Sequence, residues 1–459
     1  MGKLKNIYDY SPRFLRNMYI NAYGIKNIFR FKKWDKLLHE IEYTETLDKE
    51  AQIDLVEKKL KDIVKFAINN VPFYTKFSSL KGDIDNKSIY NVLKELPIIN
   101  KEEINKHQYA FLSKKRTKYL TSKTSGTTGT PLTVYMDRFT DLLSDALQWR
   151  RTKWAGYEKG DWIARLVGDP IIPLRIKNPK KPWIVSRFDK RVYLSTFHLS
   201  KNTSRKMGML LNKLQPAFIM GYPSSLEILC GYLNDINFQM HWVPKKILFS
   251  SEPMYPHQEK IIRSVFRSDI RGLLASGEKT ISASQCQKGT YHLSLIDGYV
   301  EGQFGIMDNK QPALLTTFSN KSMPLIRYQQ GDVIETKPSS KCECGRTLPI
   351  ISPVITKDED WIITPSGRKV SPSAITWAFI HQDIKGIKKS QVVQCSRKDV
   401  KVYLNMGSDN FLKNKNILKE SLNKVFFDEM NIEIIKSDQI EIKKSGKSRF
   451  VVNKLRKRK

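Results

Sequence analysis

The stretch Thr121–Pro131 has the composition of a phosphate-binding loop. It reads Thr-Ser-Lys-Thr-Ser-Gly-Thr-Thr-Gly-Thr-Pro, so that Gly126 and Gly129 flank Thr127 and Thr128. Glycines let a loop bend sharply and expose its N–H groups, and neighbouring hydroxyls donate to phosphate oxygens. The spacing is not that of a GxxxxGK[ST] loop, because the glycines are three apart and no lysine follows the second. A surface loop of small residues without a ligand is the alternative.

Two carboxylates and a lysine elsewhere suit phosphate chemistry. Glu278, in Ala-Ser-Gly-Glu-Lys, offers the oxygen ligand that Mg²⁺ prefers. Asp332 ends Arg-Tyr-Gln-Gln-Gly-Asp, and its ionised carboxylate offers two acceptor oxygens to a vicinal diol. Lys447, in Lys-Ser-Gly-Lys-Ser-Arg-Phe, offers an ammonium group that can stabilise negative charge. A solvated glutamate, a Gly-Asp turn and a basic tail are the alternatives.

A second kind of site is indicated by cysteine and histidine. Cys286-x5-His292 and Cys342-Glu-Cys344 together offer three thiolates and one imidazole, the ligand set that tetrahedral zinc prefers. We expect His292 in a strand and the two later cysteines on a turn, which suits a closed structural site. Free thiols inside a cell are the alternative.

Together these motifs resemble the adenylate-forming enzyme superfamily, in particular its branch of phenylacetate-CoA ligase-like and capsular-polysaccharide (CapK-type) proteins. The resemblance covers most of the chain, and its outer matches are Val71–Tyr74, Leu96–Lys101 and Ser445–Lys447. It implies an ATP-dependent ligase that forms an acyl-adenylate from a carboxylic acid and releases pyrophosphate. The acyl group would then pass to coenzyme A, another thiol, an amine or a sugar, in capsular or exopolysaccharide biosynthesis.

The resemblance also assigns roles to residues. Catalysis would fall to Lys447, Glu278 and Thr127. The nucleotide would be bound by Ser125, Gly126, Thr127, Thr128, Gly129, Ser251, Glu252 and Asp332. Glu278 would hold Mg²⁺, and some relatives carry a comparable zinc cluster.

Three positions depart from the family pattern. Thr130 stands where many relatives have a lysine, Leu274 or Ala275 replaces the aromatic residue that stacks on adenine, and Lys357 replaces the arginine of the hinge. A non-catalytic or adenylylation-only protein that binds polyanions in a glycan-assembly complex is therefore the rival hypothesis. Glu278, Asp332 and Lys447, present together, favour the ligase.

Composition sets wider bounds. The chain of 459 residues has 79 basic and 46 acidic residues, a formal net charge of +33. Such a charge favours anionic neighbours, although lysine spread by biased composition explains it as well. We expect a cytoplasmic protein without a membrane span or signal peptide, with peripheral contact to an anionic inner membrane face or glycan-assembly machinery. No motif for sequence-specific nucleic-acid binding is present.

The elements predict an α/β fold with two domains, 1–357 for adenylation and a small, mobile α+β domain at 358–459. Residues 1–120 are expected to be mainly helical, with an amphipathic helix at 51–70 that Pro72 ends. Strands and helices alternate from 132 to 274, which indicates an α/β core. Short β pieces at 291–295, 302–306 and 314–317 predict a small barrel or antiparallel sheet.

Overall fold

The computed structural model describes residues 7–115, 119–124, 132–166, 168, 170–309, 312–354, 361–380, 384, 387, 389–437 and 450–455. Three sequence predictions lie outside these residues: the loop residues Ser125–Gly129 with Thr130, the hinge at Lys357, and Lys447.

The N-terminal part is helical, as predicted. Helix α3 (Lys49–Asn70) begins where the Asp48 side chain accepts a hydrogen bond from Ala51 N, and it ends before Pro72. The expected apolar face is buried and includes Val56, Leu60 and Val64. The other helices here are α2 (Arg13–Tyr43), α4 (Pro72–Thr75), α5 (Lys81–Asn86), α6 (Ile89–Glu95) and α7 (Lys101–Lys106).

A ten-stranded sheet forms the centre of the molecule, in the order β15-β16-β11-β10-β9-β8-β7-β4-β6-β5. Strands β9, β8, β7, β4 and β6 are mutually parallel, and the rest pair antiparallel. The bounds are β4 (Ile163–Leu166), β5 (Trp183–Ser186), β6 (Arg191–Leu194), β7 (Phe218–Gly221), β8 (Lys246–Ser250), β9 (Ile270–Ala275), β10 (Ser282–Gln285), β11 (Tyr291–Leu293), β15 (Val333–Lys337) and β16 (Ile350–Val354). Since parallel strands end at the same edge, the segments after β8 and β9 are neighbours.

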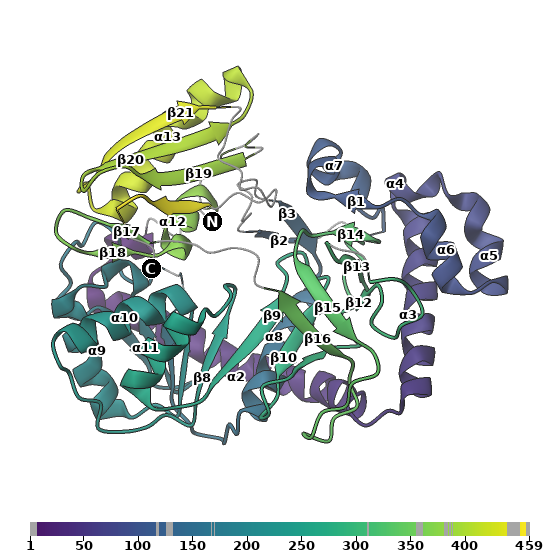
Figure 1. Cartoon of the computed structure of the whole chain (residues 1–459), viewed down its shortest axis with the longest axis horizontal. Coiled ribbons are helices and arrows are strands. Elements are labelled where there is room, and N and C mark those ends of the chain that lie inside the picture. Colours follow the sequence, from purple (N-terminus) through teal and green to yellow (C-terminus); the bar gives the residue numbers. More distant parts are fainter. Residues whose placement is uncertain are drawn as a thin grey trace.

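Helices cover both faces of this sheet (Figure 1). One face packs against α9 (Lys201–Leu214), α10 (Pro223–Asp235) and α11 (Pro256–Phe266). The opposite face packs against α2 and α8 (Arg138–Trp154), with Trp34 and Leu38 of α2 in contact with the apolar side of α8. The predicted α/β class is therefore confirmed as a three-layer arrangement.

The predicted β pieces after residue 281 are divided between two sheets. Strands β10, β11, β15 and β16 extend the large sheet, whereas β12 (Gly298–Val300), β13 (Leu314–Thr317) and β14 (Tyr328–Gln329) join β1 (Ile99–Asn100). The strand expected at 302–306 was wrong: these residues form turns, with Gly302 at a φ of +92°. A side chain is not tolerated there, since a Cβ would lie 2.7 Å from Asn309 Cβ.

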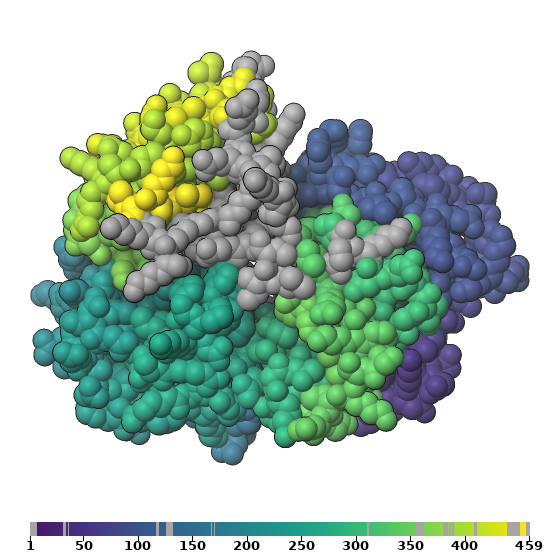
Figure 2. Space-filling model, in the orientation of Figure 1, coloured from purple at the N-terminus to yellow at the C-terminus, as the bar shows by residue number. Residues whose placement is uncertain are grey.

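Residues 361–455 fold around an apolar core made mostly of their own side chains. Their elements are β17 (Ile362–Ile363), β18 (Lys369–Val370), α12 (Pro372–Ile380), β19 (Lys389–Gln394), β20 (Asp399–Asn405), α13 (Ser408–Phe426), β21 (Asn431–Lys436) and β22 (Val451–Asn453). Figure 2 shows this part, yellow-green, resting on the teal helical layer. The Tyr232 hydroxyl donates to Gly367 O at 2.9 Å, and Arg368 donates to Phe197 O at 3.1 Å.

Candidate functional site

A short hairpin holds the two ends of the glycine loop together. Strand β2 (Leu120–Lys123) pairs antiparallel with β3 (Thr133–Met136), so Thr121–Lys123 belong to a strand and not to the predicted loop. Thr124 N donates to Leu132 O at 2.9 Å, and Leu132 N donates to Thr124 Oγ1 at 3.1 Å. Thr124 and Leu132, the described residues on either side of Ser125–Pro131, are therefore hydrogen-bonded neighbours.

The turn that carries Glu278 reaches this point from the large sheet. It follows β9, and a Cβ on Gly277 would lie 3.0 Å from Thr124 Cγ2. The absence of a side chain at Gly277 lets the two segments approach closely. The structure thus brings together two motifs that are about 150 residues apart in the sequence.

Glu278 lies at the bottom of this junction and is only 5% exposed. The hydroxyl of Tyr328, in β14, donates to its Oε1 at 3.2 Å. Burial raises the pKa of Glu278, and the nearby charge of Lys101 opposes that rise. A buried carboxyl of this kind gains from a bound cation, which would favour its ionised form.

Asp332 is tied to the same turn through side chains. Gln330 Nε2 donates to Asp332 Oδ2 at 2.9 Å, and Thr280 Oγ1 donates to Gln330 Oε1 at 3.3 Å. The hydroxyls of Thr280 and Ser276 lie 2.9 Å apart. Asp332 is therefore joined by side-chain hydrogen bonds to Ser276 and Thr280, which flank Glu278 in the turn after β9.

Arg327, at the start of the Asp332 motif, is a residue that the sequence analysis left without a role. It is 5% exposed, has a φ of +53°, and donates to Glu301 Oε1 at 2.7 Å and to Leu96 O at 2.9 Å. A buried, paired guanidinium fixes the chain locally. Arg327 thus attaches the Asp332 motif to the helical N-terminal part.

Ser251 and Glu252 follow β8 at the same edge of the sheet. Ser251 is exposed, with a φ of +70°. Glu252 accepts hydrogen bonds from Ser224 N at 3.0 Å and from Ser224 Oγ at 2.9 Å, at the start of α10. Ser373 of α12 is a further partner, and burial raises the pKa of the carboxyl. Glu252 therefore joins α10 to the C-terminal part, and nucleotide binding by both residues stays a prediction.

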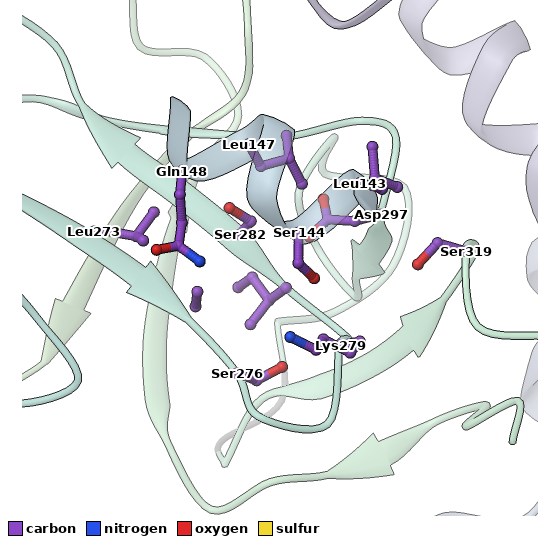
Figure 3. A pocket seen from close by; sticks show the side chains of 12 residues that line it. Leu143, Ser144, Leu147, Gln148, Leu273, Ser276, Lys279, Ser282, Asp297 and Ser319 are labelled. Atoms are coloured by element: carbon purple, nitrogen blue, oxygen red, sulfur yellow. The ribbon is translucent and has the colours of Figure 1, made fainter. Parts of the chain in front are cut away.

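A small cavity of about 40 Å³, lined by both polar and apolar side chains, lies between α8 and strands β9 and β10, next to the Glu278 turn (Figure 3). Its lining includes Ser276, Lys279 and Asp297. Burial lowers the pKa of Lys279 and raises the pKa of Asp297 to about 6. The volume holds only a few water molecules or a small group.

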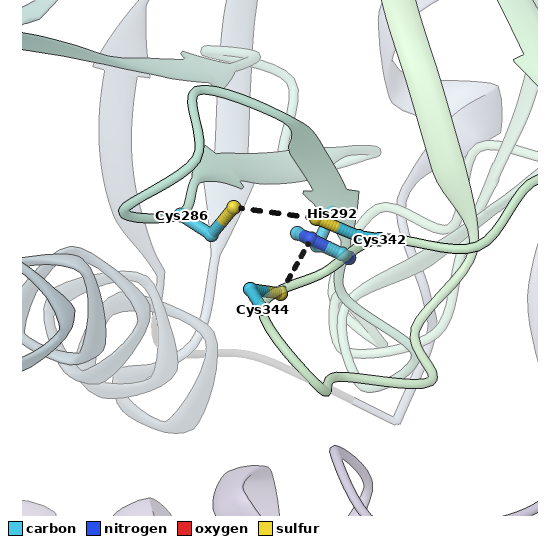
Figure 4. A group of neighbouring side chains, drawn as sticks. All are labelled: Cys286, His292, Cys342 and Cys344. Atoms are coloured by element: carbon cyan, nitrogen blue, oxygen red, sulfur yellow. Dashed lines mark hydrogen bonds between the residues drawn. The ribbon is translucent and has the colours of Figure 1, made fainter.

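The predicted cysteine and histidine cluster is assembled (Figure 4). The ligand atoms of Cys286, His292, Cys342 and Cys344 all lie within 4.8 Å of one another. Cys286 Sγ is 3.7 Å from Cys342 Sγ, and Cys344 Sγ is 3.3 Å from His292 Nε2. A tetrahedron with Zn–S bonds of about 2.3 Å has sulfur–sulfur edges of about 3.8 Å, so the four atoms fit a zinc ion.

The surroundings of His292 also suit a metal ligand. Its Nδ1 lies 3.3 Å from Leu348 O, where an N–H at Nδ1 would leave the lone pair of Nε2 free to face the cysteines. Burial lowers the pKa of His292 to about 4, so the imidazole is neutral at neutral pH. The ring also meets Trp154 edge to face, with 6.1 Å between centroids.

We expect the purified protein to carry close to one zinc per chain, and Cys342→Ser to lose it. The metal would join the β10–β11 hairpin to the segment before β16. Its loss should therefore lower Tm by roughly 2 °C or more for each kcal/mol of unfolding free energy that is lost. Elemental analysis and thermal melting measure the two effects. Cys395→Ser, outside the cluster, is the control and should keep the zinc. Protein prepared without chelator that contains no zinc would contradict the site.

Comparisons with known proteins bear on the whole chain. Residues 362–454 match the family model described as the CapK C-terminal domain. The chain is 23% identical to Protein CapK of Staphylococcus aureus over 460 residues, which cover 99% of this chain and 100% of that protein.

Solved structures of 2-hydroxyisobutyryl-CoA ligase have the same fold. One, in complex with 2-HIB-AMP and CoA in the thioesterification state, has a TM-score of 0.54 at 15% identity and covers 89% of this chain and 91% of that chain. An open conformation of the same ligase has a TM-score of 0.51 at 15% identity and covers 89% of this chain and 93% of that chain. At this identity the likeness concerns the fold.

Proposed function

We propose that this chain, a CapK-type member of the adenylate-forming superfamily, uses ATP to activate a carboxylic acid as an acyl-adenylate. The carboxylate attacks the α-phosphorus, a new C(O)–O–P link forms, and the bond to pyrophosphate breaks. An acceptor then takes the acyl group and AMP leaves. Coenzyme A is the acceptor we propose first, since it is bound in the ligase of the same fold; another thiol, an amine or a sugar is the alternative.

One observation carries the proposal: three segments distant in the sequence meet at the carboxyl edge of the parallel strands. Gly277 approaches Thr124 at the base of the glycine loop, and Tyr328 donates to Glu278. Asp332 is joined to the same turn through Gln330 and Thr280. This edge is where open α/β sheets bind ligands.

The residues at this junction suit the separate parts of a nucleotide. The glycine loop would hold the β- and γ-phosphates through its N–H groups and the hydroxyls of Thr127 and Thr128. Glu278 would hold Mg²⁺ on the phosphates, and Asp332 would accept hydrogen bonds from the ribose. The cavity beside Lys279 would receive part of the acid, and its small size favours a compact, polar substrate.

The C-terminal part would supply Lys447. We propose that 358–459 turns about the hinge near Lys357 between the two half-reactions. In the present arrangement this part is held by polar contacts, among them Tyr232 with Gly367 and Arg368 with Phe197 O, and by the packing of Leu174 and Phe197 against its apolar core. A turn of this part would exchange these contacts for others.

Exchange of labelled pyrophosphate into ATP tests the proposal. The full chain would be given Mg²⁺, ATP and a panel of small carboxylic acids, one at a time. We expect exchange that depends on one class of acid. Exchange with none of a broad panel, by protein that binds ATP, would favour the non-catalytic rival.

Asp332→Asn should weaken ATP binding, because the ribose would lose charge-assisted hydrogen bonds worth about 1.5–3 kcal/mol each. Calorimetry on both proteins should show a loss of about ten-fold or more. Asp308→Asn, at an exposed aspartate, is the matched control and should bind ATP normally. Unchanged affinity in Asp332→Asn would remove this residue from the site.

A further inference from the structure

The outward side of α2 carries a stripe of large apolar residues. Phe14, Met18, Ile25 and Phe29, called the α2 stripe below, are 62%, 64%, 38% and 62% exposed. Their spacing of four, seven and four residues places them on one side of the helix. The stripe extends about 22 Å along the helix axis. Contiguous apolar surface of this kind marks an interaction site.

The inward side of the same helix is apolar as well. Trp34, Leu38 and Ile41 are 6%, 5% and 0% exposed and pack against α8. A surface helix normally presents charged and polar residues to water on its outer side. The described part of the fold therefore leaves the α2 stripe exposed, and the stripe is available to an external partner.

Charge indicates the kind of partner. From Arg13 to Trp34 the chain has no acidic residue and six basic residues, of which Arg16 is buried and Arg30 pairs with Asp141 and Asp145 of α8. The turn between β5 and β6 lies against α2, where Arg187 N donates to Asn21 Oδ1 at 3.0 Å. This turn adds an exposed arginine, Arg187, and an exposed aromatic residue, Phe188. Exposed Lys180 and Lys181 lie near the start of the helix, where Arg13 donates to Lys181 O at 2.8 Å.

We propose that α2 docks this protein on the surface of a membrane that contains anionic lipids. The α2 stripe enters the boundary between headgroups and acyl chains, and cations such as Lys26 and Arg187 contact lipid phosphates. A second copy of the chain is disfavoured as the partner, because two identical basic helices would face each other. Among the described residues no helix is long and apolar enough to cross a membrane, so the contact lies in the plane of the surface.

Sedimentation with vesicles tests this docking. The full chain is mixed with vesicles of phosphatidylcholine that contain phosphatidylglycerol, and with vesicles of phosphatidylcholine alone. We expect binding to the anionic vesicles that weakens as salt is added. The triple variant Phe14→Ser, Met18→Ser, Phe29→Ser should lose a factor of about ten or more in its affinity for the anionic vesicles. Lys26→Glu alone should weaken binding about five-fold or more.

The control removes equally exposed apolar residues elsewhere. Met209→Ser with Leu412→Ser, on α9 and α13, changes side chains that are 60% and 75% exposed and should leave vesicle binding unchanged. Thermal melting verifies that each variant folds. The proposal would be overturned if the wild-type chain did not bind anionic vesicles, or if the triple variant bound them as well as the wild type does. It would also be overturned if the wild-type chain formed a dimer in solution and, of the variants, only the triple variant were a monomer.

Discussion

Lys447→Ala should lower the rate of adenylation by more than about 100- to 1,000-fold. That range is typical for the loss of one preorganised electrostatic contact, and here two anions would be left facing each other. The same variant should still consume an acyl-adenylate that is supplied ready-made, because the second half-reaction does not need this charge. Acid-dependent pyrophosphate release measures the first step, and AMP release from the supplied adenylate measures the second.

The control for this variant is Lys454→Ala, since Lys454 is an exposed lysine of the same basic tail. It should keep both rates. Adenylation by Lys447→Ala at the wild-type rate would place Lys447 among the solvated lysines of the tail.

Glu278→Gln should lower adenylation by about 100-fold or more and raise the Mg²⁺ concentration needed for half-maximal rate. Glutamine has nearly the same shape, and its side-chain oxygen can still accept from the Tyr328 hydroxyl. The change therefore removes the charge and little else. Rates at several Mg²⁺ concentrations measure both effects.

The pH dependence gives a separate readout. Burial raises the pKa of Glu278, and only the ionised carboxyl binds Mg²⁺, so activity should be lost as the pH falls through this raised pKa. Glu278→Gln should lack that loss at low pH. Glu335→Gln, at an exposed glutamate of β15, should keep the wild-type rate and pH profile. A full rate in Glu278→Gln would contradict the magnesium role.

Local pattern predicted α3 and the alternating core, but it did not single out α2, with 31 residues, or α13, with 19 residues. The period of apolar residues was sufficient to predict α3, and the succession of strand and helix patterns from β3 onward was sufficient to predict the α/β class, which is confirmed. The resemblance to CapK-type adenylate-forming proteins is confirmed as well. Local pattern failed at 302–306, where alternating residues form turns that need Gly302 at a positive φ.

The candidate site was predicted as separate motifs, and only its assembly required the structure. The resemblance pointed to Glu278 and Asp332, and residue chemistry pointed to the four residues of the zinc cluster. No spacing in the sequence reports that Gly277 contacts Thr124. The contact of Tyr328 with Glu278 spans 50 residues and follows from the order of strands. The outward side of α2 was missed because exposure, unlike apolar character, depends on which elements pack against a helix.

The central claim is that the acid is activated as an acyl-adenylate, and the fate of the acid's carboxyl oxygen tests this claim most directly. The full chain would receive Mg²⁺, ATP, an acceptor and the active acid labelled with ¹⁸O in its carboxyl group, and mass spectrometry would follow the label. If the carboxylate attacks the α-phosphorus, the AMP carries one labelled oxygen and the pyrophosphate carries none. Label in inorganic phosphate together with ADP, or AMP without label, would contradict an acyl-adenylate.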